Sequence, residues 1–112
     1  MKVKTSELTG AALDRAVAKA WQPVYKDASL VDAVRNGYNP STNWEYGGPI
    51  IEREGINLDN YAKNPNWSAW TPAPERDSGE AQAYGPTPLI AAMRCYVASR
   101  LGDEVDIPEE LA

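Results

Sequence analysis

The chain has 112 residues, of which 43% are hydrophobic and 24% are charged, and its formal net charge is −5. A chain of this size and composition folds around one core, so we expect a single domain over residues 1–112. The acidic balance argues against duplex nucleic acid as a partner, because proteins that bind it present a basic face to the phosphates.

Cysteine and histidine usage narrows the chemistry further. Histidine is absent and Cys95 is the only cysteine, so neither an intrachain disulfide nor a zinc site built from cysteine and histidine can form. We therefore expect no metal and no cofactor. The chain opens without the apolar run of a signal peptide and has no run of about 20 apolar residues, so we expect a cytoplasmic protein with no membrane partner.

The first two predicted elements are a strand and a helix. Residues 1–6 alternate between apolar and polar side chains, which predicts a short strand at a sheet edge, where its lysines discourage further pairing. A helix is predicted from residue 9 or 10 to Trp21, with Asp14 and Arg15 away from its apolar stripe. The stripe consists of Leu13, Ala16, Val17, Ala20 and Trp21.

The middle of the chain differs in composition from both ends. Residues 24–35 leave a short helix and a strand-like run as open alternatives. Residues 37–86 hold six of the eight glycines, six of the nine prolines and seven of the ten aromatic residues. Gly47–Pro49 predicts a turn, with short strands at Ile50–Ile51 and Ile56–Leu58. We expect either short strands joined by turns or a surface excursion held down by its own tryptophan and tyrosine side chains.

The second helix has the clearest boundaries. Thr87 is a favourable N-cap, Pro88 suits the first helical position, and Gly102 suits the C-terminal end. The broad apolar stripe of this helix consists of Leu89, Ile90, Met93, Tyr96, Val97 and Leu101. A side strip of small residues suits a homodimer contact, because it lets another element approach closely. The strip consists of Ala91, Cys95 and Ala98.

A closing strand is predicted at residues 104–107, followed by a frayed tail over residues 107–112. The whole pattern predicts an α+β fold, with a small, mostly antiparallel sheet packed against two helices. The long excursion rich in glycine, proline and aromatic residues lies in its centre. The helix at residues 88–101 is expected to form the spine of the core.

Candidate catalytic residues are few. On a strand, Glu52 and Glu54 would share one face, and a glycosidase uses two facing carboxylates. Paired charges of this kind are far more often solvated surface residues. Ser41 and Thr42 offer hydroxyls, but the chain has no histidine to activate them. We therefore expect no catalytic residues and rank a carboxylate-based hydrolase last among the functions.

Aromatic residues are the more informative set in the middle of the chain. They stack on flat bases, act as hot spots for a protein partner, or roof the core. The set consists of Trp44, Tyr46, Trp67, Trp70 and Tyr84. We interpret Trp67 as roofing the core and leave the alternatives open for Trp44 and Tyr46. Arg94 and Arg100, beside the second apolar stripe, pair with surface acids or face a pocket.

Four long runs of the sequence are similar to a known family: Met1–Asp14, Tyr38–Trp44, Gly47–Ile56 and Gly85–Ser99. In these runs the chain resembles the NinX family, small proteins of lambdoid phages and prophages. The segments between them, residues 21–35 and 58–83, depart from the family pattern, and we interpret the second as variable covering. The resemblance implies a phage origin and an accessory role in the cytoplasm of the infected bacterium. It does not imply a particular activity.

Without a catalytic set, we expect a non-enzymatic phage accessory protein that binds a partner. The leading hypothesis is sequestration of a small anionic host metabolite, such as a nucleotide-type immune signal, which would give the protein an anti-defence role. Aromatic side chains would stack on this ligand and arginines would neutralise its charge. The predicted ligand-binding residues are Trp44, Tyr46, Arg53, Arg94, Ser41 and Thr42. The alternative is a protein-interaction module that docks on a host or phage enzyme through a flat aromatic patch.

Overall fold

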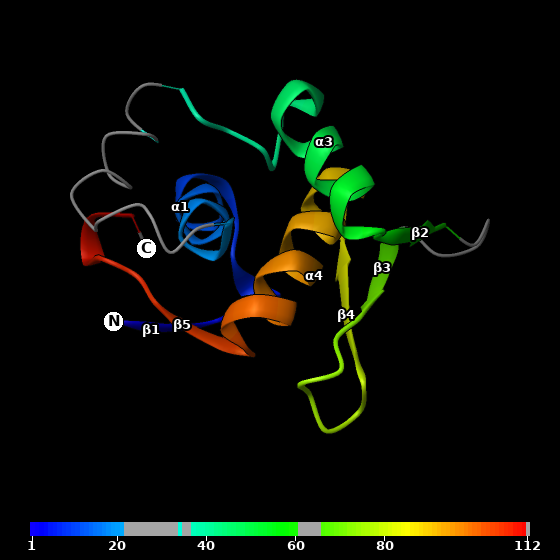
Figure 1. Cartoon of the computed structure of the whole chain (residues 1–112). Coiled ribbons are helices and arrows are strands. Elements are labelled where there is room, and N and C mark those ends of the chain that lie inside the picture. The colour runs from blue at the N-terminus through cyan, green and yellow to red at the C-terminus, as the bar shows by residue number, and fades with distance from the viewer. Residues whose placement is uncertain (22–33, 35–36, 61–65, 112) are drawn as a thin grey trace.

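A computed structural model describes residues 1–21, 34, 37–60 and 66–111 (Figure 1). The elements in chain order are β1 (Lys2–Lys4), a 3-10 turn (Thr5–Glu7), α1 (Gly10–Trp21), α3 (Trp44–Glu54), β2 (Asn57–Asp59), β3 (Trp67–Pro72), β4 (Glu80–Gly85), α4 (Pro88–Leu101), β5 (Glu104–Asp106) and a second 3-10 turn (Glu109–Leu111). Only Val34 of residues 24–35 is described, so the helix-or-strand alternative for that segment lies outside the described residues.

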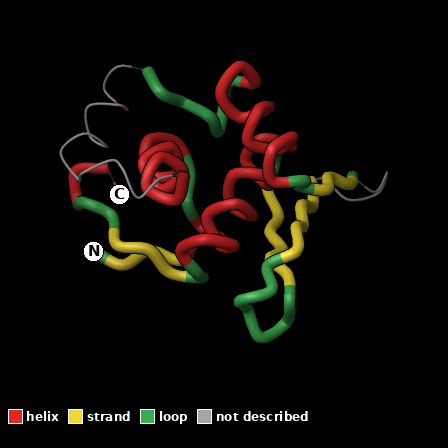
Figure 2. The backbone as a smooth tube through the Cα atoms, in the orientation of Figure 1, coloured by secondary structure: helices red, strands yellow, loops and turns green. Residues whose placement is uncertain are grey.

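The α+β class predicted from the sequence is confirmed, with two sheets in place of one. Strands β2, β3 and β4 form an antiparallel sheet in that order, and β1 pairs with β5 in a separate antiparallel ribbon (Figure 2). In the ribbon, Val3 lies opposite Val105, which confirms the predicted first and closing strands. Beyond β5, where we expected a frayed tail, Ile107 is buried and Leu111 packs partly against the core.

Helix α4 is the spine of the core, as predicted. It contacts β3 and β4 on one side and α1 and α3 on another, and it runs through the middle of the molecule in Figure 1. Its start is capped by Thr87, whose Oγ1 accepts the N–H of Ile90 at 3.1 Å, and its end is at Gly102. The small-residue strip of α4 is buried within the chain, so the structure gives no support to the homodimer contact predicted there.

Helix α1 confirms its predicted bounds, but Asp14 and Arg15 are buried and do not face solvent. The Asp14 carboxylate accepts the backbone N–H of Ser41 at 2.9 Å, and Arg15 Nη1 donates to the carbonyl of Asp106 at 3.4 Å. Periodicity assigns polar residues to the wet side of a helix. Here these two side chains instead form hydrogen bonds with backbone groups of segments that pack against α1. The sequence of α1 alone cannot reveal such long-range contacts.

The turn predicted at Gly47–Pro49 and the strand at Ile50–Ile51 are both wrong, because residues 44–54 form helix α3. Asn43 caps this helix, since its Oδ1 accepts the N–H of Glu45 at 3.0 Å. Gly55, with a φ of 64°, ends it in the left-handed region that favours glycine. The glycines and the proline mask the helical pattern in the sequence. The helix forms nevertheless, because both of its ends are capped and Ile50 is buried in the core.

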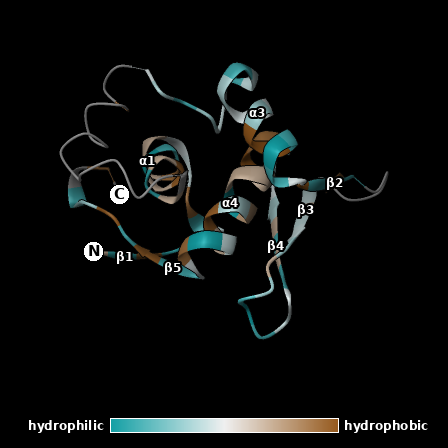
Figure 3. Cartoon of the chain, in the orientation of Figure 1, coloured by the Kyte–Doolittle hydropathy of each residue, from teal (hydrophilic) through white to brown (hydrophobic). Residues whose placement is uncertain are grey.

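Residues 58–83, which we interpreted as variable covering, contain β3 and most of the central hairpin. Ala69 and Ala81 are fully buried against α4, whereas the alternate residues of both strands point outward. Figure 3 shows β3 and β4 in pale colours, because alanine, serine and threonine give a weak hydropathy signal. Trp67 packs partly buried against the core, as predicted for a roofing residue.

Candidate functional site

The structure gathers three of the six predicted ligand-binding residues near the start of α4. Ser41, Thr42 and Trp44 line a cavity of about 240 Å³ together with residues 87–90. The hydroxyls do not face it equally: Ser41 is buried and donates its N–H to Asp14, whereas Thr42 is exposed. Since Pro88 lacks an N–H and the N–H of Ile90 is capped, this helix start offers little to an anion.

Trp44 and Tyr46 do not form a clamp. Residues two apart on a helix point to different sides. The ring of Tyr46 packs against the ring of Tyr38, with centroids 5.3 Å apart. Trp44 is 54% exposed. The predicted pair of stacking rings is therefore not brought together.

Arg53 lies at the far end of α3, in a charged cluster around Glu54. The Glu54 carboxylate accepts Arg53 Nε at 3.0 Å and Arg100 Nη2 at 2.8 Å. Burial acts to raise the pKa of Glu54, but the hydrogen bonds and charges of Arg100 and Arg53 outweigh it and lower that pKa. A carboxyl acid catalyst requires the opposite shift, and on a helix Glu52 and Glu54 do not share a face. The hydrolase therefore loses its geometric basis.

Arg94 lies apart from the other five predicted site residues, between α4 and the hairpin. Its Nε donates to the carbonyl of Leu8 at 2.9 Å and its Nη1 to the carbonyl of Tyr84 at 2.8 Å. Burial of the guanidinium lowers its pKa. Arg94 also lines a cavity of about 250 Å³ with Lys4–Ser6, Gln82 and Ala83.

A second pair of exposed aromatic residues, Trp70 and Tyr84, lies on the sheet, and the sequence interpretation did not select it. We call the side of β2–β4 away from α4 the outer sheet face. Cross-strand partners share a face in an antiparallel sheet, and the register pairs Asn57 with Trp70, Trp70 with Gln82, and Ser68 with Tyr84. The face consists of Asn57, Asp59, Ser68, Trp70, Pro72, Glu80, Gln82 and Tyr84.

Trp70 and Tyr84 dominate this face, at 41% and 52% exposed. They occupy diagonal positions on adjacent strands. Residues in such diagonal positions lie about 7–8 Å from each other. The charged members of the face, Asp59 and Glu80, are both acidic, and no lysine or arginine of the described strands lies on it. The period-two alternation in residues 67–72 and 80–85 was the signal that would have found this face.

Asp14 gives a pH-dependent prediction. Burial raises its pKa, against the opposing hydrogen bonds from Ser41. The folded state therefore holds the proton more tightly than the unfolded state, so this stabilisation is complete below the ordinary value of 3.8 and is lost as the pH rises through the folded pKa. Asp14→Asn keeps an oxygen for the Ser41 N–H without the charge.

We expect Asp14→Asn to be more stable than the wild type at pH 7, and to lose that advantage below pH 3.8. The measurement is the free energy of unfolding in urea between pH 3 and pH 8. A difference between the two proteins that stays constant across this range, or that grows in acid, contradicts the prediction.

Two searches of the described residues bear on the remaining classes of site. No group of three or more histidine, cysteine, aspartate or glutamate residues in the described part of the chain is placed to hold a metal ion. None of the described helices has the length and apolar character needed to cross a membrane.

The chain matches a known protein family. The family model described as Bacteriophage P22, NinX matches residues 4–100. The match begins at Lys4, the last residue of β1, and runs to the last turn of α4, so it spans most of the core and all of the outer sheet face. No curated protein matches the chain.

Proposed function

Since the chain belongs to the bacteriophage NinX family, we propose that this phage accessory protein acts without catalysis, by docking on a partner protein through the outer sheet face. The observation that carries the proposal is the pair of exposed rings, Trp70 and Tyr84, on a sheet face that no described element covers. Tryptophan and tyrosine are the residues that most often dominate binding at protein interfaces.

The charge of this face favours a basic partner. Asp59 and Glu80 are its charged residues among those described, and the whole chain carries −5. A partner surface rich in arginine fits both features, because guanidinium groups stack on Trp70 and Tyr84 and also pair with carboxylates. We therefore propose a basic host or phage protein as the partner, in the cytoplasm of the infected cell.

Docking of side chains fits this sheet better than addition of a long strand from the partner. At the β4 edge, arginines of the chain itself already bond two strand carbonyls, Arg76 to Glu80 and Arg94 to Tyr84. At the other edge, β2 is only three residues long. Short and covered edges of this kind discourage strand pairing between chains, so recognition falls to the face.

The structure gives less support to sequestration of a nucleotide-like metabolite. The predicted residues are divided among the start of α3, the end of α3 and the middle of α4. Four cavities lined by described residues measure about 230–250 Å³, whereas pockets for such ligands measure roughly 300–1,000 Å³. A flat aromatic face is what the interaction hypothesis requires.

The proposal predicts which surface becomes crosslinked in infected cells. A photoreactive phenylalanine analogue at Gln82, on the outer sheet face, should give a covalent adduct with one basic protein. The same analogue at Ala11, exposed on α1, is the matched control and should not. Trp70→Ala combined with Tyr84→Ala should weaken binding of the identified partner about 100-fold or more, measured by titration calorimetry, and Trp44→Ala should leave it unchanged.

Higher salt should also weaken the complex, because the proposed attraction includes opposite charges. Equal adducts from both crosslinking positions, an acidic partner, or unchanged affinity in the double variant would overturn the proposal. Circular dichroism of each variant separates loss of binding from loss of folding.

A further inference from the structure

The edge of β4 that does not pair with β3 has a definite hydrogen-bonding pattern. Ala73 N–H donates to the carbonyl of Gly79 at 2.9 Å, and antiparallel pairs alternate between bonded and non-bonded. The pairs that include Ala81 and Ala83 are therefore bonded to β3. The backbone groups of Glu80, Gln82 and Tyr84 point the other way, outward from the edge of the sheet.

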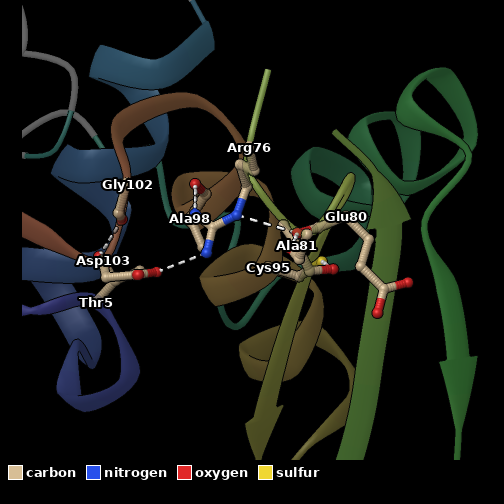
Figure 4. A network of polar contacts seen from close by, with 9 residues as sticks. Thr5, Arg76, Glu80, Ala81, Cys95, Ala98, Gly102 and Asp103 are labelled. Carbon is tan, nitrogen blue, oxygen red and sulfur yellow. Dashed lines mark hydrogen bonds and ion pairs between the residues drawn. The ribbon is translucent and has the colours of Figure 1, made fainter. Parts of the chain in front are cut away.

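Two arginines occupy the ends of this edge. Arg76 Nε donates to the carbonyl of Glu80 at 3.0 Å, and its other nitrogens reach Ala98 and Asp103 (Figure 4). Arg94 bonds the carbonyl of Tyr84 at the opposite end. Between them, the N–H and C=O of Gln82 have no hydrogen-bond partner among the described residues.

The cavity lined by Arg94 lies at this open part of the edge. Both Gln82 and Ala83 line it, although their side chains lie on opposite faces of the strand, so the strand backbone itself faces the cavity. Lys4–Ser6 line another side, and Ala98, one helical turn after Arg94 on α4, also contributes. Its volume of about 250 Å³ is large enough for a few non-hydrogen atoms and a carboxyl group.

The charges around the cavity leave one cation unbalanced. Asp103 is paired with Arg76 at 3.0 Å, and Lys4 lies opposite Glu104 in the register of β1 and β5. Arg94 forms no ion pair with a described carboxylate, and its Nη2 has no hydrogen-bond partner among the described residues. It is half-buried and bonded only to carbonyls. Burial lowers the pKa of Arg94, because the charged guanidinium loses solvation and no described anion compensates for the loss.

We propose that this edge cavity binds a carboxylate-terminated ligand. Its carboxylate would pair with the guanidinium of Arg94, and a neighbouring amide of the ligand would bond the outward N–H and C=O of Gln82. Carboxylates suit a guanidinium because two acceptor oxygens match its fork of donors. Both a free small carboxylate and the C-terminus of a peptide have this chemistry, and backbone capture of a chain end is a known form of recognition.

The test uses matched acids and amides with the 15N-labelled protein. N-acetylalanine and acetylated trialanine, each with a free carboxylate, should shift the amide resonance of Gln82 and the Nε resonance of Arg94. The corresponding carboxamides should not. Tighter binding of the trialanine acid identifies a peptide end as the ligand, and equal binding identifies a small carboxylate. Equal shifts from acid and amide, or no shifts, overturn the proposal.

Two substitutions locate the site. Gln82→Pro removes the outward N–H without removing a bond to β3, and Arg94→Lys keeps the charge but loses the fork. Arg94→Lys should weaken binding of the acids about tenfold, since a hydrogen bond to a charged group contributes about that factor. Gln82→Pro should weaken binding about fivefold, the contribution of a hydrogen bond between neutral groups. Unchanged affinity in both variants contradicts the proposal. The double variant of Trp70 and Tyr84 should bind the acids normally, so this site and the docking face are tested separately.

Discussion

Replacing Gly47 by alanine is expected to lower the free energy of unfolding by about 2–3 kcal/mol, although alanine is the better helix former. A Cβ at this position would lie 2.5 Å from the carbonyl oxygen of Pro40 and 2.6 Å from Cδ2 of Leu89. The Leu89 side chain can rotate, but the Pro40 carbonyl belongs to a backbone segment held by the adjacent bond from Ser41 to Asp14. The added methyl therefore pushes α3 away from α4.

Gly48 provides the control for this experiment. Apart from its chain neighbours, a Cβ at Gly48 meets only Cε3 of Trp44, at 3.8 Å, which is ordinary contact. The gain from alanine in a helix is opposed by Pro49, because helical geometry is disfavoured for a residue with a Cβ that precedes proline. Gly48→Ala should therefore change the free energy of unfolding by less than about 1 kcal/mol. Urea unfolding followed by circular dichroism measures both changes. If Gly47→Ala lowers stability no more than Gly48→Ala does, the close approach of α3 to residue 40 is wrong.

The substitution Ala91→Leu is expected to be the most disruptive change in α4, with a loss of about 3 kcal/mol or more. Ala91 is fully buried, and a Cβ built on Gly85 would already lie 2.7 Å from its backbone nitrogen. Helix and strand therefore approach too closely here to admit three more carbon atoms. Protein interiors are packed as densely as crystals of small molecules, so no void is present to absorb them.

Ala11→Leu is the matched control, because Ala11 lies exposed in helix α1. Its change in the free energy of unfolding should stay within about 0.5 kcal/mol. Thermal unfolding by calorimetry compares the two proteins under one condition. A variant Ala91→Leu that unfolds at the wild-type temperature would show that α4 does not pack tightly against the hairpin.

The helices at the two ends of the chain could be predicted because their signals are local. The Thr87 cap, the proline that follows it and Gly102 all act within one turn of α4, and the structure confirms each. Helix α3 has equally local end signals in Asn43 and Gly55. They were outweighed by Gly47–Pro49, a run that favours a turn when only its own residues are considered.

The candidate site could be predicted only in part. Ser41, Thr42 and Trp44 do line one cavity, because they are close in sequence. Whether Arg53 and Arg94 join them depends on how α3 packs against α4, which no local pattern contains. Trp70 and Tyr84 were named among the informative aromatic residues. That they share one face depends on the register of β3 with β4.

The sequence by itself determined the class of the protein and the limits of its chemistry. The absence of histidine, the single cysteine and the net charge of −5 are properties of composition, which no folding changes. The tertiary structure alone decided which polar residues are buried, which small residues face α4, and which aromatic rings remain in water. Those properties depend on contacts between residues far apart in the sequence or on different elements, such as Ser41 with Asp14 and Gly85 with Ala91. Such contacts produce no periodic pattern of residue types from which they could be predicted.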